Sequence, residues 1–123
     1  KMELVQVLKA IADENRLRIL YLLNQEGLCV CEIETILGMS QSNVSRHLNK
    51  LFSVGLIQRE KKSQWVYYRL DKEIIRKYPF LSNIFNGQSN QTNPFKKDQD
   101  SFNHYKKNGM SCEQLKKVST AMN

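Results

Sequence analysis

Two cysteines one residue apart are the residues of this sequence with the clearest chemistry. Cys29 and Cys31 lie at the predicted start of a short helix. Residues i and i+2 of a regular helix do not face each other, so the two sulfurs can converge on one ion only where the helix start is extended or distorted. A helix N-terminus lowers the pKa of a thiol, and thiolates bind soft ions such as As(III) and Sb(III). The pair predicts a site for a thiophilic ion, and the alternatives are a redox pair or two small buried side chains.

The third cysteine, Cys112, lies far along the chain. An odd number of cysteines, two of them too close for an ordinary structural disulfide, favours reduced thiols in the cytoplasm over a secreted disulfide framework. Cys112 is either an ordinary tail thiol or a third ligand supplied by the tail of the same or another subunit. Glu34 is a poor donor for a soft ion and is interpreted as a solvated helix residue.

A polar helix start follows a few residues after the cysteines. Ser40 fits the N-cap of a helix whose first turns are rich in serine, glutamine and arginine. The start of a recognition helix points into the DNA major groove, where Gln and Arg read base edges and Ser and His reach bases or phosphates. The alternative is a solvated polar face. The predicted DNA-binding residues are Gln41, Ser42, Ser45, Arg46, His47 and Lys50, with Arg59, Lys61 and Lys62 as phosphate contacts after this helix.

Four helices are expected to position these two sites. Helical spacing of apolar residues predicts the first over 2–12, and Asp13 fits the N-cap of a second that ends near 24–27. The third spans about 30–37, and Gly38 suits the left-handed residue that ends a helix. The fourth begins after Ser40 and ends near Gly55.

After Gly55 the spacing of apolar residues changes from the helical period to the alternation that is typical of strands. Residues 57–60 and 65–70 predict two strands joined by a turn over 61–64. A closing helix starts near Asp71 and restarts after Pro79. The expected fold class is mainly α with a small β-hairpin, in the order α-α-α-α-β-β-α, which is a winged helix-turn-helix.

Length and composition predict one folded domain followed by a tail. Residues 1–85 form the expected DNA-binding and dimerisation domain. Residues 86–123 read as a polar, basic tail, with a linker to about 110 and a short helix over 111–122. The net charge of +7 suits a polyanionic partner, but most of the excess lies after residue 71, so charge alone is a weak indicator. No apolar run is long enough to span a bilayer, so no membrane partner is expected.

The sequence closely resembles the arsenic-repressor (ArsR/SmtB) family of winged-helix metalloregulators. The resemblance covers about residues 4–71 in the right order, and the combination is highly specific. The matching segments are Lys9–Leu17, Leu28–Ile33, Ser40–Leu48, Gly55–Ile57 and Trp65–Leu70.

The resemblance implies a homodimer that binds a palindromic operator in double-stranded DNA and dissociates from it when a toxic ion binds to the protein. Its Cys-Val-Cys segment resembles arsenite and antimonite sensors, although Glu34 stands where their best-known pattern has a third cysteine. The expected inducer is As(III), Sb(III) or a trivalent organoarsenical, with no permanent cofactor. The family joins its subunits by the first and last helices, so the expected dimer interface comprises Leu4, Leu8, Ile75, Phe80 and Ile84.

Two rival functions use the same cysteines. A sensor of cadmium, lead or thiol oxidation would share the fold. An arsenate reductase or thiol oxidoreductase would need a Cys-x-x-Cys motif or a phosphate loop in an α/β pattern, and the sequence has neither, so it is not expected to be an enzyme. Residues 71–74 also lack the histidines that zinc sensors of the family carry there.

Overall fold

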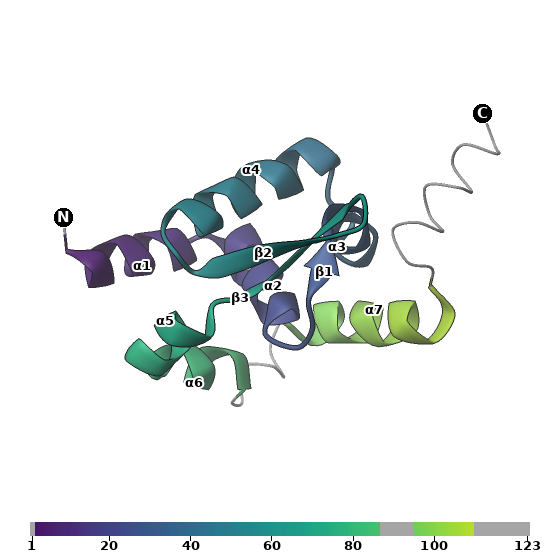
Figure 1. Cartoon of the computed structure of the whole chain (residues 1–123). Helices are drawn as coiled ribbons and strands as arrows, with labels where there is room; N and C mark the ends of the chain where they lie inside the picture. The colour runs from purple at the N-terminus through teal and green to yellow at the C-terminus, as the bar shows by residue number, and fades with distance from the viewer. Residues whose placement is uncertain (1, 87–94, 110–123) are drawn as a thin grey trace.

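The computed structural model describes residues 2–86 and 95–109, which contain seven helices and a three-stranded antiparallel sheet. Figure 1 shows α1, α5 and α6 at one end of the molecule, α4 with the β2–β3 hairpin on one side, and α7 beside α2 and α3 on the other. The elements are α1 (Glu3–Ile11), α2 (Glu14–Leu23), β1 (Leu28–Cys29), α3 (Val30–Leu37), α4 (Gln41–Ser53), β2 (Ile57–Lys62), β3 (Trp65–Leu70), α5 (Lys72–Lys77), α6 (Phe80–Asn86) and α7 (Phe95–Asn108). Within the described residues no helix has the length and apolarity that a bilayer crossing requires.

The predicted helix boundaries are set by local caps. The Asp13 carboxylate accepts the Arg16 N–H at 3.0 Å, and the Ser40 hydroxyl accepts the Asn43 N–H at 3.3 Å. Gly38 ends α3 at φ 67°, in the left-handed region where glycine carries no Cβ penalty. These contacts confirm the predicted starts of α2 and α4 and the turn between α3 and α4.

The hairpin is confirmed, and it gains a third strand. β2 and β3 pair from Ile57↔Leu70 to Lys62↔Trp65, which leaves a two-residue turn with Ser63 at φ 60°. The two-residue strand β1 pairs with β3, with Cys29 opposite Tyr67. A strand of two residues shows no alternation of its own, so β1 could not be predicted from the hydrophobic pattern.

The expectation of a linker or tail from residue 86 to 110 is wrong for residues 95–108. These residues form helix α7, which packs against α2 and α3. Phe95, Phe102 and Tyr105 join the hydrophobic core, each with less than 10% of its surface exposed. The sequence spacing of these residues is helical, because Phe102 lies seven positions after Phe95 and Tyr105 lies three positions after Phe102, which places all three on one helical face. The expected helix over 111–122 lies outside the described residues.

Candidate functional site

The two cysteines lie on either side of the start of α3. Cys29 is the residue before the helix, with φ −92° and ψ 170°, whereas Cys31 lies in its first turn. The extended Cys29 backbone turns its side chain toward Cys31, and the two Sγ atoms are 3.6 Å apart. The helix start is therefore extended, which is the condition under which the two sulfurs can converge.

This separation fits a shared ion. A thiolate lies about 2.3 Å from a metal such as zinc, so two sulfurs 3.6 Å apart would subtend an angle of about 100° at one ion. That angle lies near the tetrahedral value. Cys29 is 3% exposed and Cys31 is half-buried, so a ligand reaches the pair from the Cys31 side. The pair can chelate a soft ion without a large rearrangement.

Backbone and side-chain hydrogen bonds hold Cys29 in its extended conformation. Its pairing with Tyr67 places it at the end of the sheet. Its N–H donates to Glu32 Oε1 at 3.1 Å, the reciprocal half of a capping box. The second oxygen, Glu32 Oε2, accepts the Tyr105 hydroxyl at 2.7 Å. Sequence reasoning missed Glu32 and Tyr105, because only the folded chain brings Tyr105 to the start of α3.

A third sulfur ligand is not among the described residues. No group of three or more His, Cys, Asp or Glu side chains within 2–86 and 95–109 could hold a metal ion. Glu34 is half-buried in α3, and burial raises the pKa of its carboxyl. Cys112, the other candidate ligand, lies outside the described residues.

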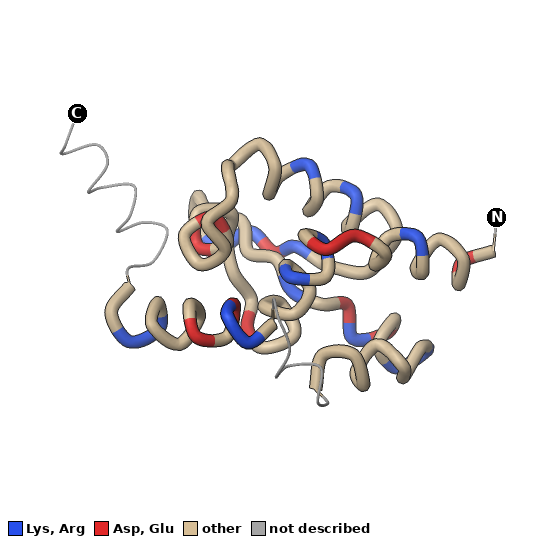
Figure 2. Tube along the Cα trace, turned by 180° about the vertical axis from the view of Figure 1, so that it is seen from behind, with Lys and Arg blue, Asp and Glu red and all other residues tan. Residues whose placement is uncertain are grey.

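Helix α4 presents an exposed polar surface from its N-terminus onward. Gln41, Ser42, Arg46 and Lys50 are exposed, and Ser45 is half-buried. The Arg46 guanidinium donates to the Asn43 side-chain oxygen at 2.8 Å, which orients it along the helix. Figure 2 shows basic positions along α4 and no acidic ones. This surface has the charge and the polar groups that a DNA groove requires.

The prediction that His47 contacts DNA is wrong. Only 2% of the His47 surface is exposed, so its side chain is not accessible to a base or a phosphate. Burial lowers the pKa of His47, against a smaller opposing effect of Asp13, and favours the neutral imidazole. Helical spacing could have indicated this, since His47 neighbours the inward-facing Val44, Leu48 and Leu51.

Strand β2 of the wing carries three exposed basic residues. Arg59, Lys61 and Lys62 all belong to β2. The Arg59 guanidinium carbon lies 4.1 Å from the centre of the Phe52 ring, a cation–π contact that fixes the wing against the end of α4. Arg59 is thus held next to α4, beside the residues that are expected to contact DNA.

Helix α3 connects the cysteine pair to α4. Its C-terminal carbonyl, on Leu37, accepts a hydrogen bond of 3.2 Å from Arg18, and Gly38 follows directly. Arg18 also donates to both carboxylate oxygens of Asp98 on α7, at 3.0 and 3.1 Å. Asp98 is 1% exposed. Sequence reasoning missed this buried ion pair, whose members are 80 residues apart.

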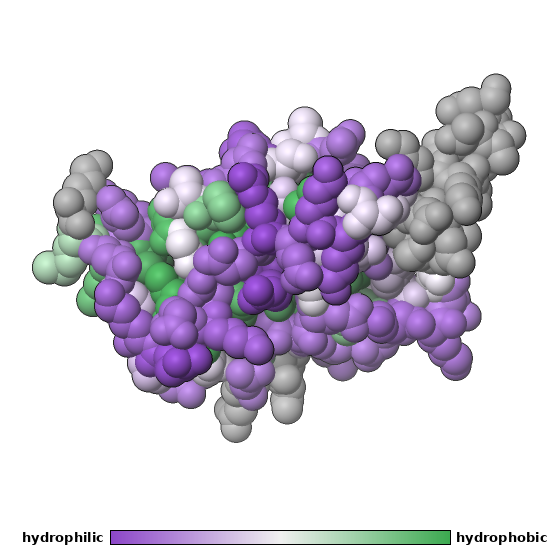
Figure 3. Space-filling model, viewed as in Figure 1, coloured by the Kyte–Doolittle hydropathy of each residue, from purple (hydrophilic) through white to green (hydrophobic). Residues whose placement is uncertain are grey.

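The predicted dimer residues lie at the α1 end of the molecule. Leu8 is 44% exposed, and the other large exposed apolar side chains in the described part of the chain are Val5, also on α1, and Met2, the residue before α1. Figure 3 shows apolar surface gathered at this end, and polar surface over most of the rest of this view. Leu4, Ile75, Phe80 and Ile84 are half-buried.

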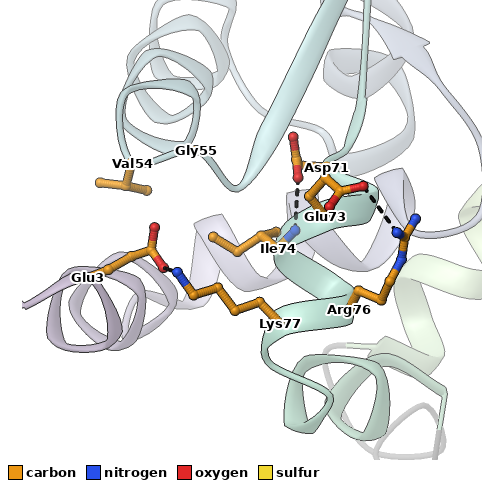
Figure 4. A pocket seen from close by; sticks show the side chains of 8 residues that line it. All are labelled: Glu3, Val54, Gly55, Asp71, Glu73, Ile74, Arg76 and Lys77. Atoms are coloured by element: carbon orange, nitrogen blue, oxygen red, sulfur yellow. Dashed lines mark hydrogen bonds and ion pairs between the residues drawn. The ribbon is translucent and has the colours of Figure 1, made fainter.

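A shallow pocket lies between α1 and α5 at the same end, and Val54 and Gly55, which follow α4, also line it. Figure 4 shows Lys77 reaching from α5 to Glu3 on α1, where the ion pair is 2.6 Å long. The Tyr78 hydroxyl donates to the same carboxylate at 2.8 Å. The hydrogen bond from Lys77, with a smaller contribution from Tyr78, lowers the pKa of Glu3. These contacts join the two helices that the dimer is expected to use.

Comparison with known proteins agrees with this geometry. Residues 13–59 match the family model "Bacterial regulatory protein, arsR family". The chain is 46% identical over 71 residues to the arsenical resistance operon repressor of Escherichia coli K12, a match that covers 57% of this chain and 61% of that protein. It is 38% identical over 76 residues to a cadmium resistance transcriptional regulatory protein CadC homolog of Staphylococcus aureus, covering 61% and 63%. The chain thus spans less than two thirds of these curated relatives.

A solved structure extends the match over more of the chain. The ArsR-like transcriptional regulator from Rhodococcus sp. RHA1 superposes with a TM-score of 0.59 at 30% identity, covering 67% of this chain and 78% of that one. The chain therefore belongs to the arsR family of bacterial regulatory proteins.

Proposed function

We propose that this protein is a dimeric transcriptional repressor that binds operator DNA through α4 and the wing and releases it when trivalent arsenic or antimony binds Cys29 and Cys31. The observation that carries the proposal is the 3.6 Å separation of two sulfurs at the start of α3, the helix that leads directly into α4. The inducer can be the inorganic ion or a trivalent organoarsenical. The family and the arsenical resistance repressor to which the chain is similar support the same assignment.

The coupling follows from the position of the pair. An ion that binds both sulfurs fixes the Cys29 backbone and the first turn of α3, and α3 packs on α4. Such a ligand changes operator affinity only if it favours an α3 conformation that DNA-bound α4 disfavours. A shift of α3 moves α4 because the turn between them is only three residues long.

Cadmium or lead sensing is the second candidate, supported by the similarity to the CadC homolog. Soft thiolates bind cadmium and lead ions as well. A titration with each ion in turn, with the remaining free thiols counted at every step, separates the candidates. The arsenic assignment would be supported if As(III) protects two or three thiols at a lower ion concentration than Cd(II) or Pb(II) requires. Protection by cadmium or lead alone would replace it, and loss of thiols by oxidation without any ion would indicate a redox sensor.

Arg46→Ala is expected to weaken operator binding by about 1–3 kcal/mol, roughly 5- to 150-fold, if Arg46 reads a base edge. The side chain is exposed on the recognition helix and oriented by Asn43, so its loss removes a contact without opening the core. Binding is measured by fluorescence anisotropy on a labelled operator fragment. Lys97→Ala is the matched control, because it removes one exposed positive charge from α7, on the other side of the molecule. Equal affinities of the two variants would exclude Arg46 from the interface.

The protein is expected to sediment as a dimer, and Leu8→Glu is expected to shift it to the monomer at micromolar concentration. Leu8 is 44% exposed, so a charge costs the folded monomer little but is unfavourable in an apolar interface. Lys97→Glu, an exposed change on α7, should remain dimeric. A wild-type protein that sediments as a monomer in analytical ultracentrifugation contradicts this assignment.

A further inference from the structure

We propose that Tyr105 of α7 is a positioning residue for the thiolate pair, which it controls through Glu32. The inference rests on the proposed function of Cys29 and Cys31 and adds a distant helix to their site. Tyr105 donates its hydroxyl to Glu32 Oε2 at 2.7 Å, and Glu32 Oε1 accepts the Cys29 N–H at 3.1 Å. One buried carboxylate therefore joins α7 to the backbone of a proposed ligand.

Burial makes this connection specific. Glu32 and Tyr105 are each 8% exposed, so water has little access to replace a lost partner. Leaving a buried carboxylate oxygen without its donor is costly, and the side chain escapes that cost by turning toward solvent. Burial, with the hydrogen bond to Glu32, also raises the pKa of Tyr105, so the phenol remains a neutral donor.

The Glu32 rotamer matters for the sulfurs because Cys29 has to stay extended. With the Cys29 backbone extended at ψ 170°, the Cys29 Sγ lies 3.6 Å from the Cys31 Sγ. When Glu32 turns away, the Cys29 N–H loses its acceptor and the start of α3 can fray into other conformations. The 3.6 Å separation is then one conformation among several, and an ion has to select it.

Helix α7 stays docked by contacts that do not involve the Tyr105 hydroxyl. Asp98 pairs with Arg18 at 3.0 Å, and Phe95 stacks on Tyr21 with ring centres 4.5 Å apart. The Tyr21 hydroxyl donates to Gln99 at 2.7 Å. Removing the Tyr105 hydroxyl therefore tests the effect of the Tyr105–Glu32 hydrogen bond on the cysteines, because α7 stays packed against α2 and α3.

The experiment compares two Tyr→Phe variants. Tyr105→Phe loses the hydrogen bond to Glu32, whereas Tyr21→Phe loses an α7 hydrogen bond remote from the cysteines. Tyr105→Phe is expected to bind arsenite and Cd(II) about 10- to 100-fold more weakly than wild type, the usual effect of removing a partner of a metal ligand. Tyr21→Phe should bind as wild type does. Binding is followed by free-thiol counting for arsenite and by the thiolate-to-cadmium absorption band for Cd(II), and unfolding midpoints are measured for both variants.

Variants of Glu32 separate positioning from a general loss of packing. Glu32→Gln keeps an oxygen for the Cys29 N–H and an amide group for Tyr105, so it should restore binding to within a few-fold of wild type. Glu32→Ala should lose binding as Tyr105→Phe does, and adding Tyr105→Phe to it should cost nothing further, because both act through one contact.

The outcomes distinguish this inference from the proposed function. If wild type binds arsenite through thiols and Tyr105→Phe binds equally well, only the positioning role is overturned. An equal loss in Tyr21→Phe also overturns it, because any weakening of α7 would then suffice. If wild type shows no thiol-dependent binding of either ion, the proposed function itself fails and the positioning role fails with it.

Discussion

Replacing Cys29 or Cys31 by serine is expected to leave operator binding intact and to abolish release by trivalent arsenic. Serine has nearly the same size, so α3 and α4 keep their packing, but its hydroxyl is a poor ligand for a soft ion. In the wild type, saturating inducer should weaken operator binding by about 1–3 kcal/mol, roughly 5- to 150-fold. In either variant that factor should fall to one. The measurement is operator anisotropy with and without arsenite.

A second arm of that experiment addresses the third ligand. Inorganic As(III) prefers three sulfurs, whereas a monomethylated arsenical has one valence filled by carbon and needs two. Cys112→Ser should abolish the response to arsenite alone if Cys112 completes the inorganic site. If Cys112→Ser loses its response to arsenite and to methylated trivalent arsenic equally, a site based on the two α3 thiolates alone is contradicted. If Cys29→Ser or Cys31→Ser still dissociates from the operator at the inducer concentration that releases the wild type, the α3 site is excluded.

Linkage gives an internal check on the same data. If the inducer weakens operator binding by a given factor, the operator must weaken inducer binding by that factor. Thiol protection by arsenite should therefore require more arsenite when saturating operator DNA is present. Identical protection curves with and without DNA would mean that the thiolate site and α4 are not coupled.

Asp98→Ala is expected to destabilise the protein by about 3–5 kcal/mol, the usual cost of leaving a buried charge without its partner. The Arg18 guanidinium would lose both oxygens of a carboxylate that is 1% exposed. The Arg18 side chain is itself 18% exposed, so partial hydration brings the expected loss to the lower end of that range. The free energy of unfolding is measured by urea denaturation.

Asp100→Ala is the control for this variant. Asp100 lies two residues along the same helix and is exposed, so its removal should change stability by no more than about 0.5 kcal/mol. A loss below about 1 kcal/mol in Asp98→Ala would mean that α7 is held mainly by its aromatic residues. A large loss would establish α7 as part of the folded domain rather than an appendage.

The sequence by itself determined the elements whose causes are local. Asp13 and Ser40 cap helices through hydrogen bonds that reach only three residues ahead, and Gly38 ends α3 through its own backbone angles. Alternation of side chains likewise predicted the hairpin, because a strand that is buried on one face repeats every two residues. Such signals are complete within a short window of sequence, so no tertiary information is needed to interpret them.

Other features were decided only by tertiary structure. The exposed polar start of α4 was predictable, but the direction of His47 depends on how the helix is turned against the core. The extended conformation of Cys29 depends on pairing with Tyr67 and on a carboxylate held by Tyr105, residues that are distant in sequence. Helix α7 looked like a tail because its composition is polar, and its charged residue Asp98 is buried only because Arg18 lies opposite, 80 residues away. A buried polar group is stabilised by its partner, and no local pattern names that partner.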